Sequence, residues 1–340
     1  MVDYKTDFFV YVDNFKKIEG VESVKLFGDD DPSAQFTIAI PTFKRTAYLR
    51  EAINSALNQD CDFTYNVIVV DNNPIRDDET EKMMQSYNGV HNLTYYKNKD
   101  NLGMAGNWNR LFQLSKSRWV VMLHDDDVLY PYYLRTCDEI IRSNNNIDIL
   151  KPKEDKAFNP SFHNRGRIKQ LFCIDFYYGN KCATPSGMLF KKDSVLKSGG
   201  YNQDYYPSLD YCFHARFAAL YNLFVYSESL MYYRIGINES CKVSVQHAWL
   251  IVDSFLIRQL LRKYHFPQWV VEGFASRRTT NTHRELQKKW GNKFEFELCE
   301  VKLKEVSEIR GLIAHAIIRI FQIIYVFYKK VWRFFSAATI

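Results

Sequence analysis

The sequence contains no C-x-x-C pair, no P-loop and no uninterrupted apolar stretch at its N-terminus. Its seven cysteines are scattered and odd in number, which predicts reduced thiols and a cytoplasmic protein. The opening MVDYKTDFFVYVDNF carries acidic side chains and does not read as a secretory signal. The glycines of NLGMAGNWN lack the G-x-G-x-x-G spacing, so P-loop and dinucleotide-binding proteins are both excluded.

Acidic residues are also absent beyond Glu308. From Gln246 onward there are 16 Lys and Arg against 8 Asp and Glu, whereas the preceding part has 29 against 31. The net charge of +6 therefore belongs to the C-terminal third. A nucleic-acid partner for the whole chain is not expected, and the basic tail suits an anionic surface.

Apolar strand patterns and helical patterns alternate over about 90 residues in the first half of the sequence. Such alternation predicts an α/β fold with a mainly parallel sheet and helices on both of its faces. The strands are expected at 36–43, 65–74, 93–98 and 119–127, and the helices at 45–59, 78–87 and 101–117.

The last of these strands ends in three aspartates, Asp125, Asp126 and Asp127. Adjacent carboxylates at a strand end repel one another unless a positive charge lies beside them. A divalent cation supplies that charge, and the carboxyl ends of parallel strands are where open sheets bind ligands. The structural alternative is that one aspartate caps a helix beginning in PYYLRTCDEII.

Five blocks of sequence together resemble the GT-A glycosyltransferases of family 2, over residues 35–245. The blocks are FTIAIPTFKRTAYLREAINSALNQ, VIVVDNN, NLGMAGNWN, LHDDDVLYP and SGGYNQDYYPSLDYCFHARF. The resemblance implies that the strand ends hold a nucleotide-sugar donor. The residues assigned to the nucleotide are Pro41, Thr42, Phe43, Arg45, Asp71, Asn101 and Asp125, with Asp71 at the base and Asp125 near the ribose.

The resemblance also implies a metal ion, Mn²⁺ or Mg²⁺. Aligning VLYP with the family makes Asp126 the main ligand, with Asp127 beside it, whereas a plain D-x-D pattern selects Asp125 and Asp127. Many relatives carry a further histidine after the Tyr-Arg pair, but the segment 235–237 has none. His214 and His247 are lone candidates for that ligand.

In the second half of the resemblance, Asp210 corresponds to the general base of an inverting transfer. The structural alternative is that Asp210 caps its helix. Arg234 lies in a segment that resembles a loop over the diphosphate, and Tyr201 and Arg216 are assigned to the acceptor side.

Residues 246–340 are expected to form a helical region after a catalytic domain at 1–245. Between about 310 and 335 the polar residues share one face of a helix, and no stretch reaches roughly 18 uncharged apolar residues. This pattern predicts a helix lying in the plane of a membrane, with its basic face toward anionic headgroups. The alternatives are a helix packed on the catalytic domain or an oligomer contact. The polar residues are His315, Arg319, Gln322, Lys329, Lys330 and Arg333.

The expected function is an inverting, metal-dependent glycosyltransferase at the cytoplasmic face of the membrane. Its donor is expected to be UDP- or dTDP-linked. Its acceptor is expected to be a glycan on a lipid-linked intermediate of bacterial surface polysaccharide. A nucleotidyltransferase acting on sugar phosphates and an inactive membrane-associated scaffold are the alternatives.

Overall fold

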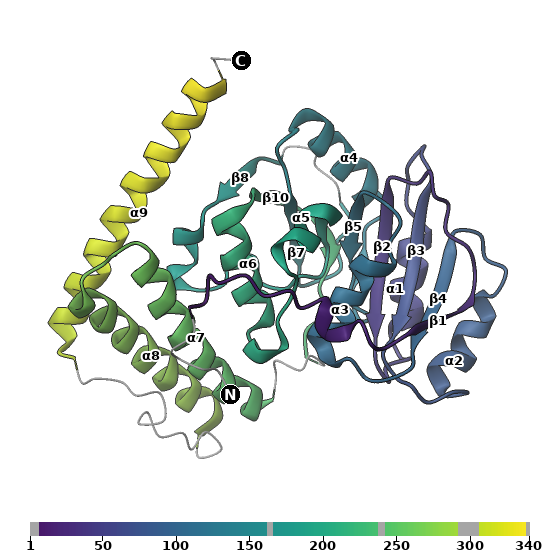
Figure 1. The fold of residues 1–340 in the computed structure, drawn as a ribbon, viewed down its shortest axis with the longest axis horizontal. Helices are drawn as coiled ribbons and strands as arrows, with labels where there is room; N and C mark the ends of the chain where they lie inside the picture. The colour runs from purple at the N-terminus through teal and green to yellow at the C-terminus, as the bar shows by residue number, and fades with distance from the viewer. Residues whose placement is uncertain (1–6, 162–165, 237–241, 292–305, 338–340) are drawn as a thin grey trace.

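The computed structural model describes residues 7–161, 166–236, 242–291 and 306–337. A ten-stranded sheet runs through the molecule in the order β1-β4-β3-β2-β5-β9-β7-β10-β6, with β8 paired to β10 (Figure 1). Its centre is the parallel set β4-β3-β2-β5, which confirms the predicted α/β fold with a mainly parallel sheet. These strands are β2 (Phe36–Thr42), β3 (Tyr65–Asp71), β4 (Leu93–Asn98) and β5 (Trp119–Met122).

Alternate side chains of these strands enter two hydrophobic cores, one on each face of the sheet. Ile38 and Val67 pack with α1 on one face, whereas Ala39 and Ile68 pack with α3 on the other. Because both faces are buried, the strands read as continuous apolar runs. The helices of this half are α1 (Leu49–Leu57), α2 (Glu79–Met84), α3 (Gly103–Leu114) and α4 (Tyr133–Ser143), with short 3-10 turns η1 (Lys16–Ile18) and η2 (Gln85–Tyr87).

The second half of the sheet mixes parallel and antiparallel pairs. Its strands are β6 (Val128–Leu129), β7 (Ile149–Asp155), β8 (Ile168–Leu171), β9 (Met188–Lys191) and β10 (Leu223–Tyr232). Its helical elements are η3 (Cys173–Tyr178), α5 (Lys192–Ser198), η4 (Gln203–Tyr205) and α6 (Leu209–Leu220).

The strand predicted at 119–127 is shorter than expected. Leu123 still donates its backbone N–H to Ala39, and the chain then turns, with Asp127 N–H donating to the carbonyl of His124. It re-enters the sheet as β6 against β10, at the far edge. Residues 123–127 therefore form a loop, named here the acidic loop, that connects the centre of the sheet to its edge.

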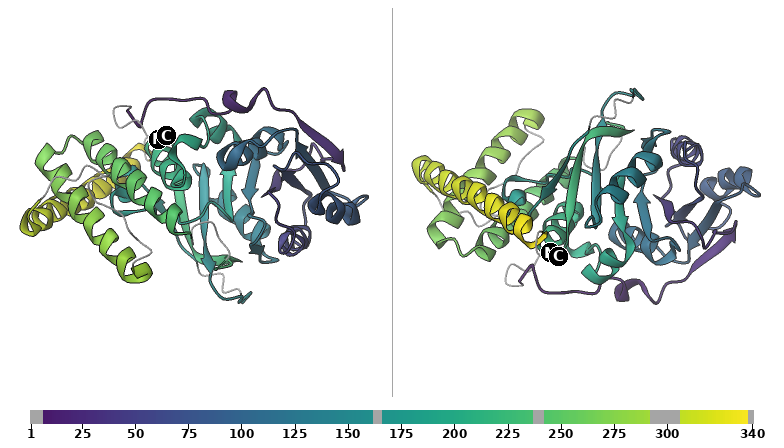
Figure 2. Two further views of the ribbon diagram at one scale, coloured as in Figure 1. Left: turned by 90° about the horizontal axis from the view of Figure 1, so that it is seen from below. Right: turned by 90° about the horizontal axis from the view of Figure 1, so that it is seen from above.

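Three long helices follow the sheet: α7 (Val243–Lys263), α8 (Gln268–Trp290) and α9 (Glu308–Ala337). Helices α7 and α8 pack side by side, and α9 crosses α8 and extends beyond the rest of the molecule (Figures 1 and 2). Over Glu308–Val331, α9 is long and apolar enough to cross a membrane, with 22% of its most apolar window buried. This span contains Arg319, so it has no run of roughly 18 uncharged apolar residues, and the in-plane orientation of the helix stays a prediction.

Helix α9 has three faces, roughly a third of a turn apart at about 100° per residue. Ala314 and Ile318 are buried against α8, and Phe321 packs against Tyr264. A second face is polar, and Gln322 on it donates to Asp175 at 2.5 Å. The third face is apolar and exposed, and its members include Leu312, Ile313, Ile320, Ile323, Ile324 and Phe327.

This arrangement differs from the predicted one. Gln322 is buried, and His315 and Arg319 line a cavity beside the sheet domain, so this part of the polar face meets protein and not headgroups. The exposed face is apolar instead. The side chain of Arg333 lies outside the described part of the structure.

The prediction missed β1 (Ser23–Phe27), which pairs antiparallel with β4 at one edge of the sheet. All five of its residues are at least partly exposed, so no buried apolar run marks it. The next residue, Gly28, has φ +84°, and a Cβ atom there would overlap the carbonyl oxygen of Leu93. Gly28 therefore allows the chain to lie directly against β4.

We expect Gly28→Ala to be much more destabilising than Gly89→Ala. Gly89 has a similar φ of +87° but open space around it, so its substitution tests backbone strain alone. Strain costs about 1–2 kcal/mol, and a clash adds about 1–3 kcal/mol at Gly28. Urea unfolding of both variants measures the difference. Equal losses would show that β1 is not held closely against β4.

Candidate active site

The acidic loop lies at the carboxyl end of β5, next to the carboxyl end of β2. The hydroxyl of Thr42, the last residue of β2, donates to Asp125 Oδ2 at 2.8 Å. Arg45 Nη2 is 2.6 Å from Asp126 Oδ2, and Arg45 Nη1 is 3.4 Å from Asp125 Oδ1. The structure thus brings Thr42 and Arg45 to two of the predicted carboxylates.

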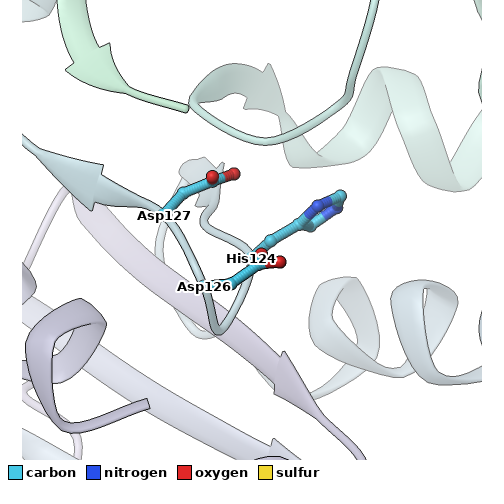
Figure 3. A group of neighbouring side chains, drawn as sticks. All are labelled: His124, Asp126 and Asp127. Carbon is cyan, nitrogen blue, oxygen red and sulfur yellow. The ribbon is translucent and has the colours of Figure 1, made fainter. Parts of the chain in front are cut away.

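His124, Asp126 and Asp127 form a cluster suited to a metal ion (Figure 3). Each offers one ligand atom, and these atoms lie within 4.8 Å of one another. The side chains extend to the same side of the loop. The acidic motif is thus suited to a divalent cation, and sequence reasoning had not assigned His124 as a ligand.

Two buried atoms of this cluster could accept or donate a hydrogen bond that the described residues do not provide. Asp127 Oδ2 and His124 Nε2 are buried and have no hydrogen-bond partner among the described residues. Burial, and then the charge of Asp126, raises the pKa of Asp127 to about 7, and burial lowers the pKa of His124 to about 4. A neutral imidazole and two carboxylates form a donor set that fits a divalent cation.

The capping alternative for the aspartates does not hold. The helix after the acidic loop, α4, begins at Tyr133 with Tyr132 as its N-cap residue, and no side chain caps it. All three aspartates are nevertheless at most 6% exposed. Their burial is therefore not explained by the start of the helix.

Arg234 lies against the acidic loop from the end of β10. Its backbone N–H donates to Asp127 Oδ1 at 2.9 Å, and its Nε donates to the carbonyl of Asp126 at 3.0 Å. Its Nη2 binds Glu51 Oε2 at 2.5 Å, and its guanidinium lies 4.2 Å from the ring centre of Tyr48. The cation predicted to serve the diphosphate is thus placed beside the carboxylates predicted to hold the metal.

Asp71, at the end of β3, is fully buried in a network of its own. Its Oδ2 accepts from Lys97 Nζ at 2.7 Å and from the Tyr95 hydroxyl at 2.9 Å, and its Oδ1 accepts from the Asn73 N–H. Burial raises the pKa of Asp71 despite the bond from Lys97. The contact of Asp71 with a nucleobase stays a prediction.

The remaining residues assigned to the nucleotide lie around these strand ends. Asn101 Oδ1 accepts from Asn72 Nδ2 at 2.7 Å, which ties the start of α3 to the end of β3. Pro41 is buried within β2, whereas Phe43 is 40% exposed. Phe43 is thus accessible to a ligand.

Asp210 lies in the first turn of α6, whose N-cap residue is Ser208 and not Asp210. Its Oδ2 accepts from Asn180 Nδ2 at 3.0 Å, and its Oδ1 accepts from the Tyr211 N–H. Burial raises the pKa of Asp210 to about 7, and the nearby charge of Asp253 contributes to the rise.

One segment, 180–186, contacts both halves of the candidate site. Asn180 binds Asp210 at one end, and at the other the Ser186 hydroxyl accepts from the His124 N–H at 3.0 Å. Trp108 stacks on His124 with ring centres 5.4 Å apart. These contacts connect Asp210 to the acidic loop, which the sequence could not show.

The histidines considered for the metal lie elsewhere. His214 is buried in α6, and its Nδ1 is 3.3 Å from Asn180 Oδ1. His247 lies on α7, outside the cluster of His124 with the aspartates.

Two residues predicted on the acceptor side are packed inside the protein. Tyr201 is fully buried, and its ring stacks on Phe213 at 4.1 Å between ring centres. Arg216 is 9% exposed and lines a small cavity with Phe8 and Tyr205. In this structure neither is open to an acceptor, because both face the core formed by α6 and the N-terminal segment.

Comparison with known proteins identifies the family. The profile described as Glycosyl transferase family 2 matches residues 37–234. An uncharacterized glycosyltransferase of Methanocaldococcus jannaschii is 28% identical over 200 residues, covering 55% of this chain and 66% of its own. One from Haemophilus influenzae is 26% identical over 168 residues, covering 48% and 55%. The chain thus spans two thirds or less of the length of these relatives.

Solved structures show the same fold. S. aureus TarS 1-349 in complex with UDP has a TM-score of 0.54 at 17% identity, covering 78% of this chain and 76% of that chain. Its complex with UDP-GlcNAc has a TM-score of 0.55 at 16% identity, covering 82% and 79%. This likeness confirms the GT-A fold. Since the family profile matches more than half of the sequence, the chain belongs to glycosyl transferase family 2.

Proposed function

We propose that this protein transfers a sugar from a nucleoside diphosphate sugar to a hydroxyl of a glycan acceptor, with inversion at the anomeric carbon. The observation that carries the proposal is the cluster of His124, Asp126 and Asp127 at the strand ends of a family 2 chain. The complexes of S. aureus TarS with UDP and UDP-GlcNAc support a UDP-linked donor, and a dTDP-linked donor fits the same proposal. The family match favours glycosyl transfer over nucleotidyl transfer.

The cluster would hold Mn²⁺ or Mg²⁺, and the cation would neutralise the diphosphate as it leaves. The imidazole nitrogen of His124 favours a transition-metal ion over Mg²⁺. Arg45 and Arg234 lie beside the aspartates, and we propose that they bind the phosphate oxygens.

Asp210 is proposed to accept the proton of the acceptor hydroxyl. The new bond forms between that oxygen and the anomeric carbon, the bond from this carbon to the phosphate oxygen breaks, and the nucleoside diphosphate leaves with the electron pair. A base with a pKa near 7 is well suited to this role at neutral pH, because about half of it is ionised and it binds a proton well.

The acceptor is proposed to be lipid-linked, with the protein attached to a membrane through α9. The exposed face of α9 places several isoleucines and a phenylalanine in contact with solvent, where they cost free energy. A bilayer surface would bury them, and Lys329 and Lys330 near the end of the helix would add attraction to anionic lipids. A role in bacterial surface polysaccharide synthesis would fit such an acceptor.

We expect Asp126→Asn to abolish Mn²⁺ binding and reduce transfer by about 10² or more, because the cluster loses a charged ligand. Isothermal titration calorimetry, with Mn²⁺ added to the protein in the presence of UDP, measures the binding. Asp193→Asn, which changes an exposed aspartate on α5, is the matched control and should bind Mn²⁺ as the wild type does. Turnover by wild-type protein in excess chelator would contradict metal dependence.

We expect Asp210→Asn to lower kcat by about 10² or more with little change in donor affinity, because the amide cannot accept the proton. The wild-type rate should rise with pH through about 7, as the carboxyl with its raised pKa ionises, and this rise should be lost in Asp210→Asn.

Asp253→Asn is the companion variant for this test. It removes a charge that raises the pKa of Asp210 and retains an acceptor for the Ser208 hydroxyl, so the pH rise should move to lower pH at an unchanged plateau. If Asp210→Asn stays within a few-fold of wild type, another carboxylate is the base. Asp204, exposed and paired with Lys17 at 3.1 Å, is then the next to substitute.

We expect Ile323→Gln/Phe327→Gln to weaken binding to anionic vesicles, because both side chains lie on the exposed face of α9. Leu220→Gln/Phe158→Gln is the matched control, since these apolar side chains are similarly exposed elsewhere. Vesicle co-sedimentation measures the binding of both double variants. Alkaline carbonate extraction distinguishes a helix that lies on the membrane from one that crosses it. Equal binding of the two double variants would rule out attachment through this face.

A further inference from the structure

A cavity of about 370 Å³ lies between the sheet domain and α9. Lys169 of β8, the η3 turn and Lys181 line it from the sheet domain, and His315 and Arg319 line it from α9. This volume lies within the range of about 300–1,000 Å³ that is usual for small-molecule sites. No residue of the His124–Asp127 cluster lines this cavity, so it is a separate feature.

The lining of the cavity has an excess of positive charge. Lys169, Lys181 and Arg319 are its cations, and Asp175 is its one carboxylate. Both oxygens of Asp175 are engaged, Oδ2 by the Phe172 N–H at 2.8 Å and Oδ1 by Gln322. In the part of the chain that the structure describes, none of the three cations lies within 4 Å of a carboxylate oxygen.

The cations also repel one another. Burial lowers the pKa of Lys181, and the charges of Arg278 and Arg319 lower it further. His315 responds in the same way, with its pKa lowered by burial and by nearby Arg277 and Arg319. Positive groups held together in this manner favour the binding of an anion.

The residues that line the cavity are next in sequence to a partner of the proposed base and to the exposed face of α9. Lys181 directly follows Asn180, whose side-chain amide binds Asp210 at 3.0 Å. On α9, Arg319 is one residue before exposed Ile320, and Gln322 is one residue before exposed Ile323. A ligand with an anionic head and an apolar chain could therefore place its head in the cavity and its chain along α9.

We propose that this cavity binds a phosphate or diphosphate group carried by a lipid, the group that links the acceptor glycan to its lipid. The proposal deepens the proposed function and rests on it. Lysine ammonium groups and an arginine fork are the side chains that bind phosphate oxygens most strongly. Held there, the lipid-linked acceptor would have its phosphate beside Lys181, the residue that follows Asn180, the partner of Asp210.

The test uses full-length protein and farnesyl diphosphate, a soluble lipid diphosphate, in calorimetric titration. Excess chelator is present, so that no metal-bound phosphate at the acidic loop contributes. We expect binding to weaken by about tenfold or more in Lys169→Gln/Lys181→Gln, because two of the three cations are lost. Lys169→Arg/Lys181→Arg keeps the charge and should retain binding.

The matched control is Lys82→Gln/Lys116→Gln, which removes the same charge from exposed sites. Lys82 lies on α2, at the opposite end of the molecule from α9 (Figure 1). The control should bind farnesyl diphosphate as the wild type does. Equal weakening in both Gln double variants, or no binding by wild type, would overturn the proposal.

Inorganic diphosphate and dipalmitoyl phosphatidic acid vesicles identify the source of the anion. Tighter binding of farnesyl diphosphate than of inorganic diphosphate assigns a lipid-borne group, and equal binding assigns a free anion and overturns the lipid proposal. Vesicle binding as tight as that of farnesyl diphosphate, and dependent on Lys169 and Lys181, would assign a general lipid headgroup and overturn the acceptor proposal. Thermal stabilisation by nucleotide sugars, measured in the same variants, should be unchanged, so failure of the donor site is distinguished from failure of the cavity.

Discussion

The structure depends on how three buried carboxylates in one short loop are kept from repelling one another. Asp125, Asp126 and Asp127 lie in a loop that leaves the centre of the sheet. Arg45 and Arg234 contact them from two other segments, yet one oxygen of Asp127 has no hydrogen-bond partner among the described residues, and its pKa is raised to about 7. The protein alone therefore compensates this charge incompletely, and a bound cation would complete the compensation.

The second half of the molecule also contains a carboxyl group with a raised pKa, that of Asp210. Asp210 is held by Asn180, and the segment that begins at Asn180 reaches His124 through Ser186. A carboxyl with a raised pKa is thus positioned by the same segment as the acidic loop. In that segment, Lys181 lines a cavity whose lining carries three cations and one carboxylate. Two acidic sites and one basic cavity thus follow one another along this segment, which would suit the proposed metal-bound donor and the proposed phosphate of the acceptor.

Much of the central fold could be predicted from the sequence, because buried parallel strands such as β3 and β4 read as continuous apolar runs. The edge strand β1 could not, since its side chains are all partly exposed. The residues at the strand ends could be predicted too, because they directly follow these apolar runs. Asn180 and Ser186, which bind Asp210 and His124, could not, because they come from a loop without any periodic pattern.

Helix α9 shows what a periodic pattern of polar residues cannot predict. A helical pattern identifies a polar face but not what that face meets, and Gln322 meets Asp175, which lies 147 residues earlier in the chain. Tyr201 and Arg216 were assigned to the acceptor side by resemblance to the family, and the sequence did not show that the fold buries both.

Binding of a nucleotide sugar tests the central claim most directly. Purified protein is heated with Mn²⁺ and each member of a panel of nucleotide sugars. A ligand at 100 times its Kd stabilises the folded state by about 2.7 kcal/mol, which is a shift of several degrees in Tm. We predict that one donor raises Tm in this way and that chelator removes most of the shift. If no nucleotide sugar raises Tm with Mn²⁺ present, the account of this site is contradicted.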